Sequence, residues 1–119
     1  MKVIFVTDLH GDRNKYNRLR DIVVFEKPSI VINGGDILPY AEKNIDMQKM
    51  FIVKDLDAHL QYFEKNKINY LFQPGNEDLK IFDELYEKYD KTFKYVKCTM
   101  NKVTSIGDYE FIGFDIIVM

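Results

Sequence analysis

The sequence predicts an α/β fold built on a parallel sheet, and three observations support this prediction. Short apolar runs at 2–7, 29–33 and 69–73 alternate with longer segments whose apolar residues recur at helical spacing. Glycine follows each run within a few residues and allows a tight turn there. Such alternation is typical of parallel strands joined by right-handed crossovers. The 119 residues are enough for one domain and hardly for two, so we expect a single domain over 1–119.

The first strand and helix are expected in the first 26 residues. The run at 2–7 is unbroken, as in strands that are buried on both faces. A helix over 15–26 follows, Pro28 ends it, and the second strand covers 29–33. The spacing of apolar residues predicts that the buried face of this helix carries Tyr16, Leu19, Ile22 and Val23.

A long helix is expected after the second strand. Asp46 can cap it, and the helical pattern continues to about residue 66. The third strand, 69–73, is followed by a third helix over 79–89. The inward residues predicted for the long helix are Met47, Met50, Leu56, Leu60 and Phe63, and those for the third helix are Phe82, Leu85 and Tyr86.

The pattern changes in the last quarter of the chain. Residues 93–98 resemble a short strand, and 101–106 with 109–114 resemble a hairpin around Gly107-Asp108, a favoured turn pair. The segment 116–119 is apolar and is expected to contact a partner. We therefore expect a βαβαβα parallel sheet followed by a short strand and a hairpin.

Polar side chains follow all three predicted parallel strands. Asp8 and His10 come after the first strand, Asp36 after the second and Asn76 after the third. Asp8 and His10 are two residues apart, so on extended backbone they would point to the same side. The carboxyl ends of parallel strands share one sheet edge, where open α/β sheets bind ligands. Because carboxylate and imidazole suit a divalent transition metal, we expect these four side chains to surround a cation.

Simpler explanations exist for the individual residues. Taken singly, each predicted ligand could be a helix cap or a turn residue; their order on successive strands favours a shared site. Asp12 can hydrogen-bond its loop or His10, and Asp78 can orient Asn76, but a solvated or capping role explains either equally well. His59 and Cys98 are expected to be structural core residues.

Composition excludes several classes of function. With 17 basic and 19 acidic residues the net charge is −2, which argues against a general nucleic-acid-binding surface. The single cysteine, Cys98, cannot form an internal disulfide and favours a reducing compartment. No apolar run is long enough for a membrane span or signal segment. We therefore expect a cytoplasmic protein that does not bind membranes.

Three ordered motifs end the three strands: Asp8-Leu9-His10, Gly35-Asp36 and Gly75-Asn76-Glu77-Asp78. They resemble the first three signatures of the calcineurin-like metallophosphoesterases, D-x-H, G-D and G-N-H-[DE]. The resemblance covers about residues 1–114. Within this family, the chain resembles the small prokaryotic phosphoesterases. It implies the N-terminal portion, about half, of the family's α/β/β/α sandwich, in an apparently truncated domain.

The resemblance also implies roles for individual residues. Asp8 and His10 would hold one metal, Asp36 would bridge two metals, and Asn76 would hold the second. The catalytic positions would be Asp36, Asn76 and Glu77. The cofactors would be divalent Mn, Fe or Zn ions. The intact family site holds two such ions, and this chain would hold as few as one. The substrate would be a small phosphate mono- or diester, hydrolysed by two-metal catalysis.

Two departures from the family pattern leave a second interpretation open. Glu77 stands where the family often has histidine, and an anionic glutamate would repel phosphate. The family's later histidines have no counterpart, because this chain has only His10 and His59. The alternative is therefore a catalytically impaired fragment that acts as a metal-binding or interaction module. An uncovered sheet face would favour self-association or a complementing C-terminal half. A nucleotide-binding Rossmann-like domain is disfavoured because the first turn lacks G-x-G-x-x-G.

Overall fold

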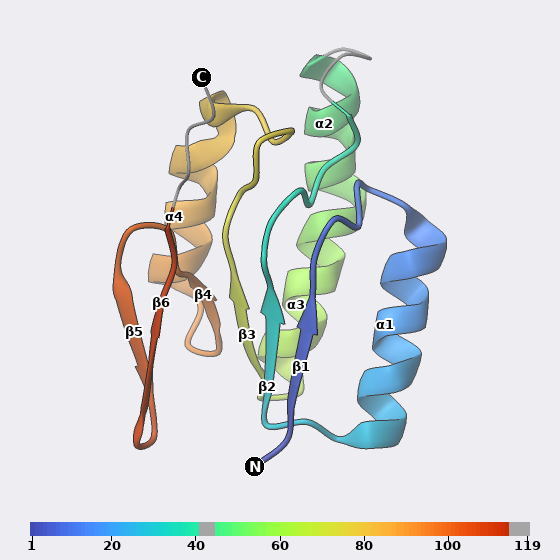
Figure 1. Ribbon diagram of the computed structural model, residues 1–119. Coiled ribbons are helices and arrows are strands. Elements are labelled where there is room, and N and C mark those ends of the chain that lie inside the picture. Colours follow the sequence, from blue (N-terminus) through green and yellow to red (C-terminus); the bar gives the residue numbers. More distant parts are fainter. Residues whose placement is uncertain (41–44, 115–119) are drawn as a thin grey trace.

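The computed structural model describes residues 1–40 and 45–114 and contains a parallel sheet flanked by helices (Figure 1). The sheet comprises β1 (Val3–Val6), β2 (Ile30–Asn33), β3 (Asn69–Phe72) and β4 (Val96–Cys98), in that spatial order. The helical segments are α1 (Arg13–Glu26), α2 (Ile45–Phe51), the π-helix η1 (Ile52–Leu56), α3 (Asp57–Lys65), the 3₁₀ turn η2 (Lys80–Phe82) and α4 (Asp83–Thr92). A separate antiparallel hairpin follows, formed by β5 (Val103–Ile106) and β6 (Tyr109–Ile112).

The predicted fold class is confirmed, with one addition. The parallel sheet alternates with helices and the hairpin turns around Gly107 as expected. The short strand predicted at 93–98 is present as β4. It pairs with β3 in parallel and so adds a fourth strand to the first sheet, which was not predicted. The strands also end level with one another: Val6 pairs with Asn33, Asn33 with Phe72, and Phe72 with Cys98. The loops that follow the strands therefore start side by side at one edge.

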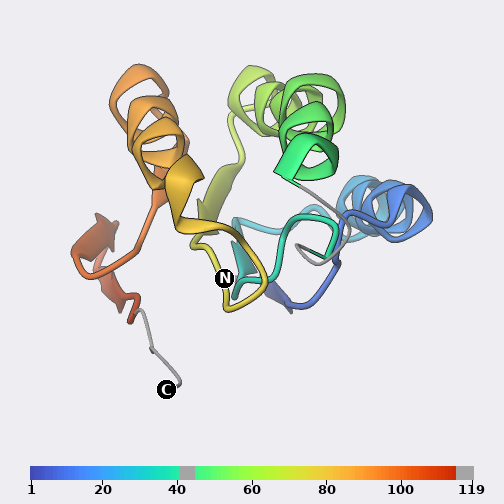
Figure 2. The ribbon, with the colours of Figure 1, turned by 90° about the horizontal axis from the view of Figure 1, so that it is seen from above.

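The helices lie on one side of the sheet only. A sheet whose strands follow chain order, joined by right-handed crossovers, places every connecting helix on the same face, and Figure 2 shows this arrangement from above. The prediction that the first strand is buried on both faces is wrong. Phe5 is 64% exposed and Val3 41%, because no helix within 1–40 and 45–114 lies over the outer face of β1.

The core lies between the sheet and the helices. Leu60 and Phe63 of α3 pack there with Tyr70 and Phe72 of β3. His59 is buried in the same cluster, where its ring makes T-shaped contacts with the rings of Tyr16, Phe63 and Tyr70. The structural roles predicted for His59 and Cys98 are thus confirmed by their burial.

The predicted inward faces are only partly correct. On α1, Tyr16, Leu19 and Val23 are buried but Ile22 is 41% exposed. Leu56, Leu60 and Phe63 point inward as predicted, whereas Met47 and Met50 are exposed. Phe82 and Leu85 are half-buried and Tyr86 is fully buried.

The error at Met47 and Met50 has a local cause. The π-helix η1 closes i→i+5 hydrogen bonds, so it holds more residues per turn than an α-helix and rotates the residues before it out of phase. The inward positions of α2 become Gln48 and Phe51. Asp46 lies in the first turn of α2 rather than capping it, because the helix already includes Ile45.

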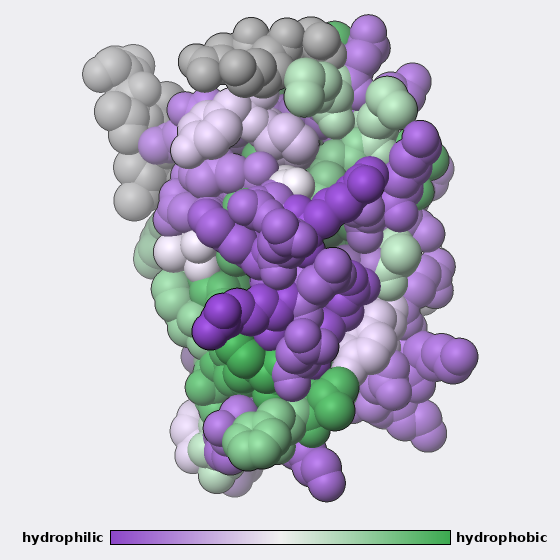
Figure 3. Space-filling view, turned by 90° about the vertical axis from the view of Figure 1, so that its right-hand side faces the viewer, coloured by the Kyte–Doolittle hydropathy of each residue, from purple (hydrophilic) through white to green (hydrophobic). Residues whose placement is uncertain are grey.

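The surface has two kinds of face. Seen from the α1 side, it is largely hydrophilic, with hydrophobic surface gathered toward the lower end, where the strands begin (Figure 3). The uncovered sheet face carries an apolar pocket of about 380 Å³ between the sheet and the hairpin, lined by residues that include Phe5, Ile32, Leu71, Phe111 and Phe114. No helix in 1–40 or 45–114 is long and apolar enough to cross a membrane. The apolar segment 116–119, expected to contact a partner, lies outside the described residues.

We expect the buried His59 to make the fold sensitive to acid. Burial lowers the pKa of His59 to about 3, whereas the unfolded side chain titrates near 6.5. Between these two values the unfolded chain binds one more proton than the folded chain, so stability falls as pH falls, by about 1.4 kcal/mol per pH unit. Urea denaturation from pH 7 to pH 5 should show this loss in the wild type and a smaller one in His59→Phe. Parallel pH dependences in the two proteins would contradict the prediction.

We also expect self-association through the uncovered sheet face, because an exposed apolar patch of this kind is unusual in a monomer. Phe5→Ser should shift sedimentation toward the monomer. Phe25→Ser is the matched control, since Phe25 is 82% exposed but lies on α1. A wild type that stays monomeric at high concentration would contradict this prediction.

Candidate metal centre

The loops after β1 and β2 run alongside each other at the carboxyl edge of the sheet. Three backbone hydrogen bonds join them: Asp8 N–H donates to the Gly35 carbonyl (3.0 Å), His10 N–H to that of Asp36 (2.9 Å), and Gly11 N–H to that of Ile37 (2.9 Å). These bonds continue the pairing of β1 with β2 beyond the strands. They place residues 8–11 directly beside residues 35–37.

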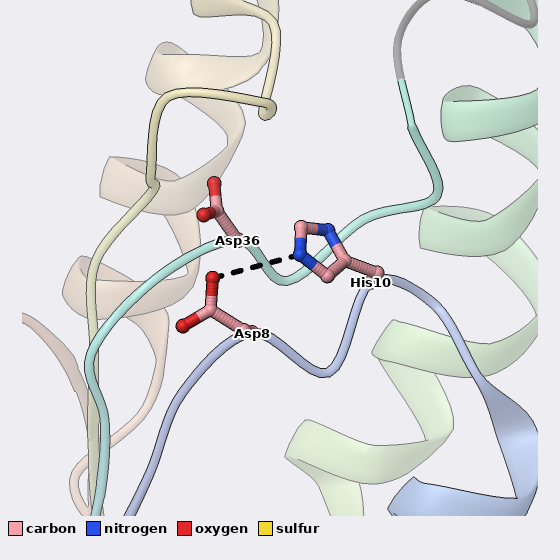
Figure 4. Close-up of side chains that lie close together, drawn as sticks. All are labelled: Asp8, His10 and Asp36. Atoms are coloured by element: carbon pink, nitrogen blue, oxygen red, sulfur yellow. Dashed lines mark ion pairs between the residues drawn. The ribbon is translucent and has the colours of Figure 1, made fainter.

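This pairing brings three predicted ligands together. One ligand atom from each of Asp8, His10 and Asp36 lies within 4.8 Å of the other two. Figure 4 shows the three side chains close together on the two loops, with Asp8 and His10 facing each other and His10 Nε2 3.5 Å from Asp8 Oδ1. Carboxylate and imidazole donors grouped this closely suit a divalent transition metal.

The three side chains converge for a different reason from the one that the sequence suggested. Asp8, His10 and Asp36 all have left-handed backbone, with φ of 60°, 47° and 51°. Asp8 and His10 therefore do not share a side through extended pleating, and that part of the prediction is wrong. Left-handed conformations in non-glycine residues are uncommon and tend to occur at functional sites. Here the left-handed conformations direct the three side chains toward a common region, which an extended backbone would not do.

The charges in the triad also favour a cation. The pKa of Asp8 is lowered, first by a side-chain hydrogen bond with Asp36 and then by one with Thr7. Two carboxyl groups this close repel each other when both are ionised, and a divalent ion between them would relieve that repulsion. The imidazole of His10 is oriented by stacking on Tyr40, with ring centroids 4.1 Å apart. The donor set therefore fits a divalent metal.

The third loop reaches the triad through its backbone. Glu77 N–H donates to Asp36 Oδ1 at 2.9 Å. Gly75 makes this approach possible, because a methyl group in its place would overlap the backbone nitrogen and Oδ1 of Asp36. The Asn76 side chain is exposed and lies between these two residues in the chain. The loop of the fourth predicted ligand thus contacts Asp36 directly.

The two uncertain aspartates have separate roles. Asp12 caps α1, its Oδ1 accepting hydrogen bonds from the backbone N–H of Asn14 and Lys15. Asp78 is 4% exposed and is not solvated. Its carboxylate accepts hydrogen bonds from the backbone N–H of Ile37, Leu38 and Gly75. Burial raises the pKa of Asp78, partly offset by these bonds, and the residue ties the second loop to the third.

Two residues near the site were not predicted. Tyr40 stacks on His10, but nothing in the sequence distinguishes it from other loop tyrosines. Gln48 is fully buried and hydrogen-bonds both the second and the third loop. The spacing of apolar residues did not predict its burial, because the π-helix moves this polar residue onto the inward face of α2.

The comparison with known families agrees with this site. The family model described as calcineurin-like phosphoesterase matches residues 1–117. The chain belongs to the calcineurin-like phosphoesterase family. No curated protein matches the chain. Members of this family are in general metal-dependent phosphoesterases acting on small phosphoesters, and the Asp8–His10–Asp36 group fits that requirement.

We expect the triad to bind one divalent cation. Isothermal titration of the metal-free protein with Mn²⁺ should show binding that Asp36→Ala abolishes, because two ligands alone seldom hold a metal in protein sites. Asp12→Asn is the matched control: the residue is close in sequence but caps α1, and asparagine is an equally good cap. Equal affinity in wild type and Asp36→Ala would contradict this assignment.

Proposed function

We propose that this calcineurin-like phosphoesterase hydrolyses a phosphate mono- or diester at the centre formed by Asp8, His10, Asp36 and Asn76. The observation that supports the proposal is the convergence of the first three side chains at the carboxyl edge of the sheet, within a chain of this family. Manganese, iron and zinc ions all suit the mixed carboxylate, imidazole and amide donor set, and we propose one of these as the cofactor. We also propose a cytoplasmic location, on the basis of the single cysteine.

The residues of the chain would divide the work between them. A bound divalent ion would polarise phosphoryl oxygens and lower the pKa of water to near neutrality. Asp8 and His10 would hold it from the first loop and Asp36 from the second. Asn76 would hold the second ion of the family site from the third loop, whose position is set by the Glu77 N–H bond to Asp36 Oδ1.

Glu77 would differ from the histidine that the family often has at this position. Its backbone N–H already has a role, since it donates to Asp36. Its side chain would carry negative charge near an anionic substrate, and it has no proton to give a leaving group when it is ionised. We therefore propose that the preferred substrates have good leaving groups, which need no protonation.

One observation favours the alternative of a metal-binding or interaction module. Among the described residues, only one group of three or more histidine, cysteine, aspartate or glutamate residues could hold an ion. Two-metal catalysis requires a second ion about 3.5–4 Å from the first. Metal stoichiometry therefore separates the two proposals: two ions per chain favour the enzyme, and one ion without turnover favours the module.

Hydrolysis of bis(p-nitrophenyl) phosphate tests the enzyme proposal. With Mn²⁺ added, the wild type should release p-nitrophenol, and EDTA should stop the reaction. Asp36→Asn should lower kcat about 100-fold or more, because a ligand of the metal that stabilises the transition-state charge is lost. Asp12→Asn should keep wild-type activity, because only the cap of α1 is exchanged. Wild-type turnover no higher than that of Asp36→Asn would refute the proposal.

A further inference from the structure

We propose that Gln48 is a positioning residue of this centre: its side-chain amide holds the second and third loops at the separation that the ligands require. Gln48 lies on α2 and belongs to none of the three motifs. The inference rests on the proposed function, since it assigns a role toward the same metal ligands. It is carried by the hydrogen bonds that this one buried amide makes to both loops.

The amide of Gln48 uses both ends of its side chain. Nε2 donates to the carbonyl of Pro39 in the second loop (2.6 Å) and to that of Glu77 in the third (2.8 Å). Oε1 accepts a hydrogen bond from Leu79 N–H (3.1 Å). The side chain is 0% exposed, so water cannot replace these bonds. Two donors and an acceptor on one side chain require an amide, and a glutamine has the reach from the helix.

The contact with Glu77 leads directly to Asp36. Gln48 holds the carbonyl of Glu77, while the N–H of the same residue donates to Asp36 Oδ1. Gln48 thus fixes the backbone of the residue that in turn fixes the central ligand. Asp78 joins the same two loops but bonds Ile37, Leu38 and Gly75, so it does not replace Gln48 at Glu77.

The contact with Pro39 leads to His10. Pro39 precedes Tyr40, the residue whose ring stacks on the His10 imidazole. Pro39 also packs against Gly11 of the first loop so closely that a side chain at Gly11 would overlap the proline ring. Holding the Pro39 carbonyl therefore steadies the surroundings of His10 as well. One amide on α2 is connected in this way to all three ligand-bearing loops.

The test replaces Gln48 by methionine, which is similar in shape and makes none of these hydrogen bonds. The Mn²⁺ dissociation constant of Gln48→Met, measured by electron paramagnetic resonance below the melting temperature, should rise about 10–100-fold, as for other residues that orient metal ligands. Gln48→Glu puts an acceptor-only carboxylate oxygen against the Pro39 and Glu77 carbonyls, so the dissociation constant should rise at least as much. Leu60→Val, a core change on α3 distant in sequence from the loops, should lower the melting temperature without changing metal affinity.

A second measurement does not depend on metal. In the metal-free protein, Gln48→Met should speed hydrogen exchange of the Glu77 amide, which bonds Asp36 and not Gln48, by a factor similar to the loss of affinity. Leu60→Val should not speed it selectively. If the wild type binds none of Mn²⁺, Fe²⁺ and Zn²⁺, the proposed function fails, and Glu77 exchange still decides the role of Gln48. Unchanged Glu77 exchange in Gln48→Met, or Mn²⁺ affinity within twofold of the wild type, would overturn the inference.

Discussion

The level ends of the parallel strands are the constraint on which the candidate site depends. Val6, Asn33 and Phe72 are register partners across three strands, so the loops that follow them leave the sheet at the same height. Backbone hydrogen bonds then continue between the first two loops as far as Gly11 and Ile37. Side chains that are far apart in the chain meet because the register of the sheet places their loops side by side.

The loops themselves are strained, and the surrounding contacts hold them. Three neighbouring polar residues with left-handed backbone would each be unfavourable in a free chain. Hydrogen bonds from the side chains of Asp78 and Gln48 hold the second and third loops in place despite this unfavourable backbone conformation. Glycine at position 75 allows the third loop to approach Asp36 without overlap. The site is therefore positioned by hydrogen bonds that backbone groups of the loops make with one another and with the side chains of Asp78 and Gln48.

The same strand order has a cost on the opposite face of the sheet. Strands that follow chain order place every connecting helix on one side, so the site edge is well supported while the outer face is left open. Phe5 and the pocket beneath the hairpin are exposed as a result. The carboxyl edge of the sheet carries the candidate ligands, whereas the outer face carries exposed apolar side chains. Both follow from one topological choice.

The sequence by itself determined the strand–helix alternation, the hairpin, the family motifs and the residues of the triad, because these depend on local periodicity and on residue type at short spacing. Only the tertiary structure decided that β4 joins the first sheet, that Phe5 is exposed and that the π-helix turns Gln48 inward and Met50 outward. It also decided that the ligands converge through left-handed turns and that Tyr40 orients His10. These features depend on which segments become neighbours in space, and no local pattern in the chain carries that information.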